Sequence, residues 1–393
     1  MSSITLDRSI RSSSRFSTYW RAYRSVLGLV LVMVVLAILT EGTFFSPRNL
    51  TNLTRQVAIN GILAVGMTYV ILIGGIDLSV GSVVALTGVI AGLTQVNLGL
   101  AQWSGGVSAE LGALLSLLAA VAAGTLCGVF NGWMITRNRI APFIITLGMM
   151  VIARGLALIL AKGAAIAPLG DAFNVLGQGY LDSIITIGVV VLVGGSAAFL
   201  PLLRKRKAVS VYLNSFVVLL MTSLSLWVFL GYRGLPIPVL IFGLLAILGV
   251  LILQKTRLGR FILAIGGNAE AAWLSGVPIG KITLGIYIML GALSGLCGAI
   301  LASRLNGALP TAGELFELDA IAAVVIGGTS LRGGVGSVRG SILGAFFIGA
   351  LNNGMSLLDV TEFYQKVIKG VIIILAVWLD MRQTSHRSHS PHS

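Results

Sequence analysis

Charged side chains are scarce in this sequence. Only 10% of its 393 residues are Asp, Glu, Lys or Arg, whereas 56% are apolar, and soluble domains carry roughly 25% charged residues. A water-soluble fold of this length could not cover its surface with so few charges. The lipid bilayer is therefore expected to be the solvent for most of the chain.

Acidic residues are the rarer kind, with 13 Asp and Glu against 27 Lys and Arg and a net charge of +14. Such an excess could indicate nucleic-acid binding. The basic residues, however, lie mainly between apolar runs and in the two tails, where the positive-inside rule places them in a membrane protein. We therefore expect no nucleic-acid partner.

Groups for covalent, metal or nucleotide chemistry are equally rare. Both cysteines, Cys127 and Cys297, lie inside apolar stretches and indicate no disulfide framework. The three histidines all occur in a Ser-rich C-terminal tail, where a solvated tail is a simpler interpretation than a metal site. The string nearest to a Walker A motif, 276–282, has the wrong spacing and lacks Ser or Thr after Lys281. The chain is thus expected to be non-catalytic and to bind no cofactor or metal.

Apolar runs of membrane-spanning length recur along the chain. A helix needs about 20 apolar residues to cross the hydrocarbon core. The expected spans are 26–45, 57–76, 80–97, 111–136, 142–161, 183–203, 209–230, 236–254, 282–301, 318–330, 339–357 and 366–380. The tenth is too short to cross alone and is expected to be a half-helix packed inside the protein. The runs predict an all-α, polytopic membrane bundle with about twelve crossings.

The tails set the expected orientation. Residues 1–25 are rich in Ser and Arg and nearly free of acid. A cleaved signal or transit peptide would look similar, but no small-x-small cleavage site follows the first apolar run. We therefore expect a cytoplasmic N-terminal tail and a retained first span. Counting spans from there puts the C-terminus in the cytoplasm as well, with 382–393 as a disordered tail.

The loops agree with that count. Those containing Arg137, Arg139, Arg204 to Lys207 and residues 255–281 fall on the cytoplasmic side. Those containing Asp171, Asp182, Glu314, Glu317 and Asp319 fall outside. Each strongly basic loop lies where the positive-inside rule requires.

Glycine is abundant, with 50 residues, and part of it is spaced for helix contact. G-x-x-x-G units occur at Gly124–Gly128–Gly132, Gly291–Gly295 and Gly340–Gly344. Small residues on one helix face let two backbones approach closely within a membrane. These units predict a compact bundle but do not identify a cargo.

A polar string, GGIDLSVGS at 74–82, interrupts the apolar pattern. Its two glycines loosen the backbone, and Asp77 or Ser79 could then cap the next helix. Alternatively, a broken helix places polar groups toward a translocation path. A similar string at 326–338 shares an I-G-G start and a V-G-S-V end, which favours an internal repeat of the kind transporters use.

The expected cytoplasmic loop 255–281 has a helix pattern of its own. Asn268 is placed to cap a helix, Glu270 lies in its first turn, and Gly276 is a stop signal. A short amphipathic helix on the cytoplasmic face could dock in a groove of a partner. On these residues alone it could equally be a simple interfacial helix.

At these segments the sequence resembles the sugar-permease family of ATP-binding-cassette (ABC) importers, which includes ribose, xylose and multiple-sugar permeases. The strings that carry the resemblance are GGIDLSVGS at 74–82, PFIITLGMMVIARG at 142–155, GRFILAIGGNAEAAWLSGV at 259–277, ELDAIAAVVIGGTSLRGGVGS at 317–337, NNGMSLLDV at 352–360 and YQKVIKGVIIILAVWLD at 364–380. Six strings in the same order make the resemblance specific.

The resemblance implies partners. It implies a second permease copy in a homodimer, a cytoplasmic ABC ATPase that holds the ATP and Mg²⁺, and a periplasmic sugar-binding protein. It also implies that 259–277 contains the helix that contacts the ATPase. The coupling residues expected on that basis are Arg260, Gly266, Gly267, Asn268, Glu270, Ala271, Ala272, Trp273 and Gly276. Members of the family usually have Arg where this chain has Trp273, which puts the role of that position in doubt.

The resemblance also implies an architecture. Residues 26–381 would form the transmembrane domain, with a ten-span core similar to that of the cobalamin importers. Residues 183–230 would be an inserted pair of spans, because ribose-type members have a shorter connection there. This insertion and the string MSLLDV at 355–360 most resemble the xylose-type permeases.

The sequence thus predicts a permease subunit in the bacterial inner membrane. This subunit is expected to translocate a pentose that the binding protein delivers, and D-xylose is the expected pentose. The residues expected near the path or its gates are Asn60, Asp77, Ser79, Asn131, Asn352 and Asn353. Inter-helical hydrogen bonding is the alternative role for each.

The alternatives for the whole protein are a permease for another monosaccharide, a peptide or amino-acid permease, and an ion-coupled secondary transporter. Arg154, inside the span 142–161, needs a partner that the sequence does not identify.

Overall fold

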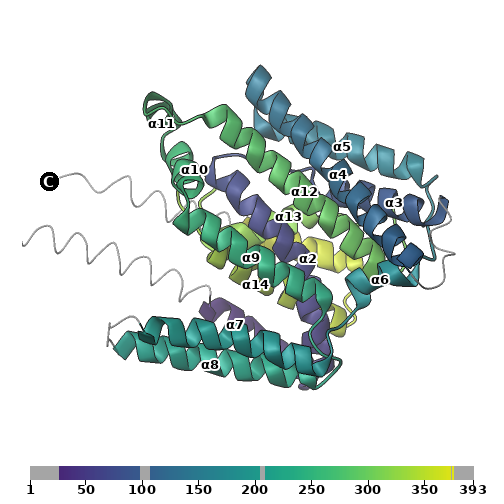
Figure 1. The fold of residues 1–393 in the computed structure, drawn as a ribbon, viewed down its shortest axis with the longest axis vertical. Coiled ribbons are helices and arrows are strands. Elements are labelled where there is room, and N and C mark those ends of the chain that lie inside the picture. The colour runs from purple at the N-terminus through teal and green to yellow at the C-terminus, as the bar shows by residue number, and fades with distance from the viewer. Residues whose placement is uncertain (1–25, 98–106, 204–208, 373, 376–393) are drawn as a thin grey trace, which may run out of the picture.

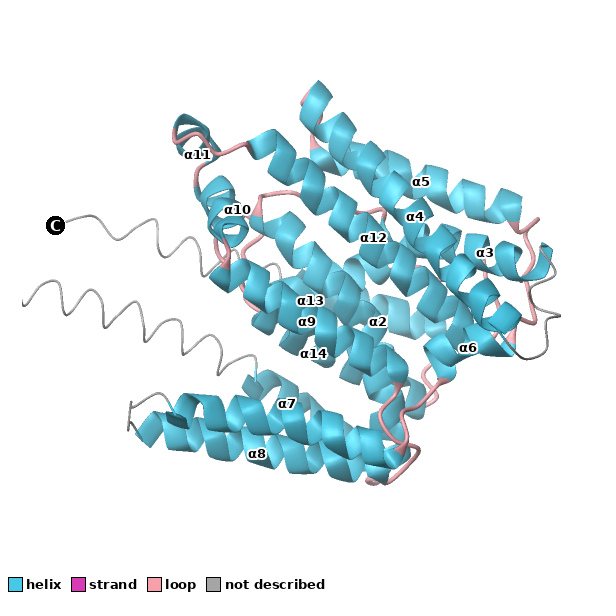
Figure 2. Ribbon diagram, viewed as in Figure 1, coloured by secondary structure: helices cyan, strands magenta, loops and turns pink. Residues whose placement is uncertain are grey.

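The computed structural model describes residues 26–97, 107–203, 209–372 and 374–375. Over these ranges the chain is a bundle of helices joined by loops, with two isolated β-bridges as the only extended pairing (Figure 2). This confirms the predicted all-α membrane class. The predicted tails 1–25 and 382–393, the basic link at 204–207 and the end of the last span lie outside the described residues.

In chain order, the elements are the helix Val26–Leu39, η1 (Thr43–Phe45), α2 (Pro47–Leu72), α3 (Val80–Asn97), α4 (Val107–Asn138), α5 (Pro142–Leu160), α6 (Asp171–Gln178), α7 (Ser183–Leu203), α8 (Val209–Leu230), α9 (Ile237–Lys255), α10 (Arg257–Gly267), α11 (Ala269–Leu274), α12 (Ile279–Leu305), α13 (Phe316–Ile326), α14 (Val338–Leu357) and a last helix from residue 362. Within the described ranges, five helices (α2, α4, α5, α9 and α12) are long and apolar enough to cross a membrane. Shorter apolar helices lie at Val26–Leu39, Val80–Val96, Ser183–Phe199 and Asn214–Leu230. The number of membrane crossings, about twelve, stays a prediction.

The central element is α2, which is buried along nearly its whole length and contacts α9, α12, α13 and α14. It begins ten residues before the predicted span 57–76, so that boundary was wrong. Ser46 caps the helix by accepting from the amide of Asn49 at 3.3 Å, and Pro47 occupies the first turn. Hydropathy missed this start because the first turns are polar and face the protein rather than lipid.

The G-x-x-x-G units place α4 directly against α12. A Cβ on Gly124 would overlap the carbonyl oxygen of Gly291, and one on Gly128 would overlap the carbonyl oxygen of Tyr287. The two backbones can approach this closely only because these positions lack side chains. The predicted role of the units in helix contact is confirmed.

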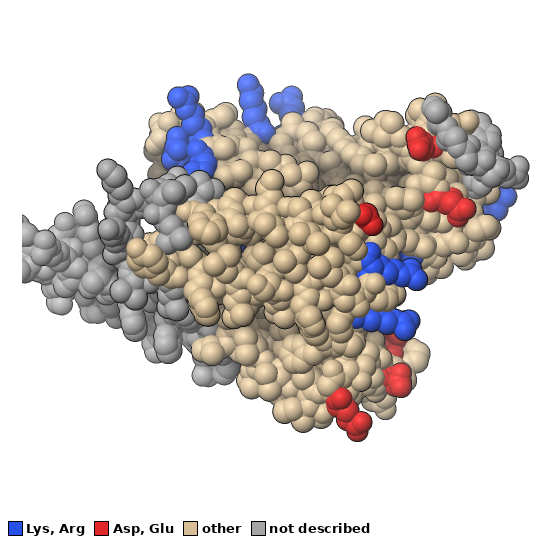
Figure 3. All heavy atoms as spheres, turned by 60° about the horizontal axis from the view of Figure 1, so that its bottom comes forward, with Lys and Arg blue, Asp and Glu red and all other residues tan. Residues whose placement is uncertain are grey.

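Charged side chains lie at both ends of the bundle. Figure 1 shows α10 and α11 at one end and α6 at the other. Arg137 at the end of α4, Lys255 at the end of α9, and the exposed Arg257 and Arg260 lie at the α10 end. On the face shown in Figure 3, charged side chains lie toward the margins and a broad uncharged surface separates them. An uncharged band between charged ends is what a membrane-embedded bundle requires.

The predicted inserted pair forms two adjacent helices, α7 and α8, with the predicted bounds. They pack on each other, with the hydroxyl of Ser215 donating to the carbonyl of Ala198 at 2.8 Å, and they lie side by side at the bottom of Figure 1. Large apolar side chains such as Leu192 (71% exposed) and Phe216 (64% exposed) point away from the protein. Exposed apolar surfaces of this kind are what a helix pair placed in a bilayer would present.

The short tenth segment is α13, which has 11 residues and thus a length of about 16 Å at 1.5 Å per residue. It ends at a Gly-rich break, after which α14 begins. The expectation of a half-helix inside the protein is confirmed, with Ala320, Ala323 and Val324 fully buried.

Candidate functional site

The segment predicted to couple to a partner forms two short helices, α10 and α11. Asn268 connects them, and its side-chain oxygen accepts from the amide of Ala271 at 3.0 Å, so its predicted capping role is confirmed. Gly276 follows with φ +78°, a conformation that stops a helix and favours glycine.

The outer face of α11 is apolar and exposed. Trp273 is 68% exposed and Leu274 is 73% exposed, whereas Ala272 is buried against the bundle. The other predicted coupling residues, Arg260, Gly267, Asn268, Glu270, Ala271 and Gly276, are also exposed, and Gly266 is partly buried. Whether this exposed apolar face is a contact surface for another protein, as predicted, stays a prediction.

The end of α10 lies against the end of α2. A Cβ on Gly266 would overlap the carbonyl oxygen of Leu72 and the amide nitrogen of Gly334. The amide of Gly334 itself donates to the carbonyl of Leu72 at 2.9 Å. A Cβ on Gly333 would lie 3.0 Å from the amide nitrogen of Gly74. We call Leu72, Gly74, Gly266, Gly333 and Gly334 the glycine junction; here α10 contacts both Gly-rich helix breaks.

The first break separates α2 from α3 and is organised by Asp77. One carboxylate oxygen accepts from the amide of Ser79 at 2.8 Å and from its hydroxyl at 2.6 Å. Asn131 of α4 donates to the same hydroxyl at 3.1 Å. Three of the predicted path residues therefore form one buried cluster, which ties the start of α3 to α4.

Two more polar atoms lie in or near this cluster without a hydrogen-bond partner. They are the hydroxyl of Tyr287 and the side-chain oxygen of Asn131, and both residues are 1% exposed. A Cβ on Gly75 would lie 2.7 Å from the Tyr287 hydroxyl, so this tyrosine of α12 borders the break. Sequence reasoning missed Tyr287 because it occurs in an otherwise ordinary apolar span.

The second break separates α13 from α14 and is built in a similar way. Gly328 has φ +85°, close to the +79° of Gly74 in the first break. The hydroxyl of the buried Thr329 accepts from the amide of Ser337 at 3.3 Å, and Ser337 caps α14 by accepting from Gly340 at 3.0 Å. Helix, glycine turn and polar cap recur in the same order. The positive φ falls on the first glycine of I-G-G in one break and on the second in the other, so the internal repeat stays a prediction.

A third polar group gathers around Asp319 on α13. One of its oxygens accepts from Lys369 at 3.1 Å, from Asn352 at 3.1 Å and from Asn60 at 3.5 Å. The side chain of Asp319 is 2% exposed and that of Lys369 19%. The prediction that Asp319 lies in an external loop was wrong. The half-helix α13 begins at Phe316, and the Asp319 carboxylate is buried inside the bundle.

Asn353 forms a separate reciprocal pair with Asn49 of α2. Each amide nitrogen donates to the other side-chain oxygen, at 2.9 and 3.0 Å. The predicted path residues thus fall into three groups, around Asp77, Asp319 and Asn49, rather than along one line. Whether any of them contacts a transported molecule stays a prediction.

Arg154 forms hydrogen bonds to the loop between α12 and α13. Its guanidinium donates to the carbonyls of Pro310 at 2.7 Å and Ala312 at 2.9 Å. No carboxylate within the described ranges forms a salt bridge with it. The arginine therefore fixes the entry to the half-helix α13.

Replacing Arg154 with Met is expected to lower the free energy of unfolding by roughly 1–3 kcal/mol, because two carbonyls lose a charged donor. The measurement is the unfolding midpoint in detergent. Arg137→Met, which removes an exposed cation from α4, serves as the control. Equal midpoints for the two variants would show that the loop does not need this anchor.

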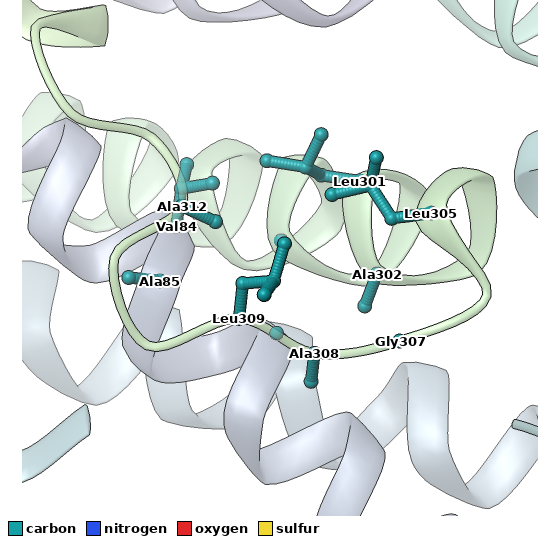
Figure 4. A pocket seen from close by; sticks show the side chains of 11 residues that line it. Val84, Ala85, Leu301, Ala302, Leu305, Gly307, Ala308, Leu309 and Ala312 are labelled. Carbon is teal, nitrogen blue, oxygen red and sulfur yellow. The ribbon is translucent and has the colours of Figure 1, made fainter. Parts of the chain in front are cut away.

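A small hollow lies between α3, α12 and the same loop (Figure 4). Its lining consists of alkyl side chains and glycines, including Val84, Leu301, Leu305 and Leu309. A sugar needs several hydrogen-bond donors and acceptors, which this lining does not provide. The hollow is therefore packing space rather than a sugar site.

The family model described as "Branched-chain amino acid transport system / permease component" matches residues 49–377. The chain belongs to this permease family. The permease is 38% identical to the xylose transport system permease protein of Haemophilus influenzae over 372 residues, which is 92% of this chain and 96% of the relative. It is 39% identical to the xylose transport system permease protein of Escherichia coli, with 90% of each chain covered.

The permease is also 38% identical to the ribose import permease protein of Bacillus subtilis over 361 residues, which is 91% of this chain and 92% of the relative. No solved structure gave a significant match. The family inferred from the six sequence strings is confirmed, and the secondary-transporter alternative loses its support.

Proposed function

We propose that this permease is the membrane-spanning subunit of an ATP-driven importer for pentoses, and for D-xylose in particular. The pentose class is supported by relatives whose names specify xylose and ribose, both five-carbon sugars, at similar identity. The preference for D-xylose rests on the helix pair at 183–230 and the string at 355–360.

The observation that carries the proposal is the exposed apolar face of α11, fixed to the two helix breaks through the glycine junction. Trp273 and Leu274 are the groups that an ATPase groove would cover. Movement of α11 would reach α3 through Gly74 and α14 through Gly334, because α10 contacts both breaks. The permease itself makes and breaks no bond, and ATP with Mg²⁺ would be held by the partner ATPase.

The translocation path would form between two copies of the chain. Within the described ranges, the hollow in Figure 4 is too apolar to hold a sugar, so a homodimer is the simplest source of a path. In this arrangement residues 26–381 form the transmembrane domain, a ten-span core similar to the cobalamin importers plus the α7–α8 pair. A periplasmic binding protein would deliver sugar at the α6 end, and both termini would lie in the cytoplasm.

The deciding experiment is uptake by proteoliposomes that contain the permease, an ABC ATPase and a sugar-binding protein. We expect ATP-dependent accumulation of D-xylose, weaker accumulation of D-ribose and none of L-leucine. Leucine is the informative competitor because the matching family model is described by branched-chain amino acids. Accumulation of leucine alone, or of sugar without ATP, would refute the proposal.

Replacing Trp273 with Ala is expected to weaken ATPase binding about 30-fold, since a buried interface tryptophan contributes at least about 2 kcal/mol. The affinity of purified permease for the ATPase measures this directly. Trp227→Ala is the control, because Trp227 is 53% exposed but lies on the lipid-facing α8. If both variants bind the ATPase like the wild type, α11 is not the contact surface.

A further inference from the structure

Three arginines gather around Tyr180 at the α6 end of the bundle. The guanidinium of Arg55 on α2 donates to the Tyr180 hydroxyl at 3.0 Å and lies 5.4 Å from the centre of its ring. The guanidinium of Arg233 lies 5.9 Å from the same ring and 5.5 Å from the ring of Tyr232. Arg304, in the last turn of α12, packs with its backbone against Gly177, whose carbonyl accepts from Arg55 at 2.8 Å. We call Arg55, Tyr180, Tyr232, Arg233 and Arg304 the arginine–tyrosine cluster.

Over the part of the chain that the structure describes, none of the three arginines of the cluster forms a salt bridge. Asp182, two residues after Tyr180, is exposed and forms no ion pair there. The Nε atom of Arg55 is buried and has no acceptor. The Arg55 guanidinium is held by the Tyr180 hydroxyl and by the carbonyl of Gly177 at 2.8 Å. The Arg233 guanidinium lies beside two tyrosine rings and is exposed, and guanidinium N–H groups suit an anion with several acceptor oxygens.

The cluster lies beside the turn where the apolar helix α8 ends and the apolar helix α9 begins. Tyr232 and Arg233 occupy the turn between the end of α8 at Leu230 and the start of α9 at Ile237. Arg233 is exposed, and the neighbouring Trp227 and Leu230 of α8 present apolar surface at 53% and 41% exposure. Acyl chains would pack on α8 while a headgroup reaches the arginines.

We propose that the arginine–tyrosine cluster binds the phosphate of an anionic phospholipid. Arg233 and Arg304 would each offer N–H groups to the phosphate oxygens, and Tyr232 would lie beside the glycerol. A bound lipid would then connect α2, α9 and α12, which contribute to or flank the cluster. The site needs only the membrane location of the chain, so it stands independently of the transported sugar.

The test is native mass spectrometry of the full-length permease in detergent with phosphatidylglycerol. Diacylglycerol with the same acyl chains is the phosphate-free probe, and inorganic phosphate is the lipid-free probe. We expect retained phosphatidylglycerol, no comparable retention of diacylglycerol, and no displacement of lipid by millimolar inorganic phosphate.

Arg233→Gln is expected to weaken phosphatidylglycerol binding about tenfold, the loss of one charge-assisted contact. Arg233→Lys should recover only part of it, because Lys keeps the charge but lacks the planar fork. Lys162→Gln, which removes an exposed cation that has no acidic partner, is the matched control and should bind lipid like the wild type. Unfolding midpoints of all three variants establish that they are folded.

Several results would overturn the lipid site. They are equal retention of diacylglycerol, equal weakening by Lys162→Gln, Arg233-dependent binding of inorganic phosphate that displaces the lipid, or binding of poly-glutamate in place of phosphatidylglycerol. The last would point instead to an acidic protein surface. Because lipid retention is measured without sugar, ATPase or binding protein, these results leave the transport proposal untouched.

Discussion

Gly266→Val is expected to reduce ATP-dependent uptake at least about tenfold, while the exposed face of α11 stays unchanged. The added side chain would overlap the carbonyl of Leu72 and the amide of Gly334, both backbone atoms that cannot rotate away. Forcing bulk into a packed contact costs about 1–3 kcal/mol, and each 1.4 kcal/mol corresponds to a factor of ten. Since α10 contacts both helix breaks through this junction, the loss should appear in the coupling of ATP hydrolysis to transport.

Two measurements distinguish a loss of energy coupling from a loss of ATPase binding. The Gly266→Val permease should bind the ATPase with wild-type affinity but fail to raise ATP hydrolysis when the loaded binding protein is added. Gly280→Val is the matched control, because a Cβ at this exposed first-turn position of α12 would meet no atom within 4 Å. If Gly266→Val transports normally, the glycine junction does not transmit motion.

Lys369→Met is expected to destabilise the permease by about 3 kcal/mol. It removes the cation that pairs with Asp319 at 3.1 Å and leaves a carboxylate of 2% exposure without its counter-charge. Breaking a buried pair from one side is costly, whereas removing both charges is often nearly neutral. The double variant Asp319→Asn with Lys369→Met should therefore regain most of the stability.

The measurement is denaturation in mixed detergents, followed by the loss of helical circular dichroism. Lys366→Met is the control one helical turn away, because the pair of Lys366 with Glu314 at 2.8 Å is 46% and 60% exposed. An exposed pair contributes at most about 1 kcal/mol. Equal destabilisation by Lys366→Met, or a double variant less stable than Lys369→Met, would contradict this account of the Asp319 group.

Hydropathy predicted most helices of the bundle because lipid-facing segments such as α5, α7 and α8 must be apolar throughout. It failed at the start of α2, where Asn49, Thr51 and Arg55 are polar but form hydrogen bonds to α14, α8 and α6. A composition window cannot distinguish a polar residue in a loop from one that is hydrogen-bonded inside a bundle.

The candidate site was predictable only where it is local in sequence. The cap at Asn268 and the stop at Gly276 follow from residues a few positions apart, and both were confirmed. The contacts of Asp319 with Lys369 and of Arg154 with Pro310 join residues 50 and 156 positions apart. Nothing in one sequence specifies which distant groups meet, so the predicted path residues could not be sorted into their three clusters.

The contact between α4 and α12 bears on which parts of the permease can change shape during a transport cycle. Gly124 and Gly128 hold the two backbones in direct contact, so we expect these two helices to travel as one block. Any rearrangement has to be absorbed elsewhere, at the two Gly-rich turns that already hold left-handed backbone angles. A covalent tether between α4 and α12 would accordingly leave cargo flux intact, whereas one across either turn would stop it.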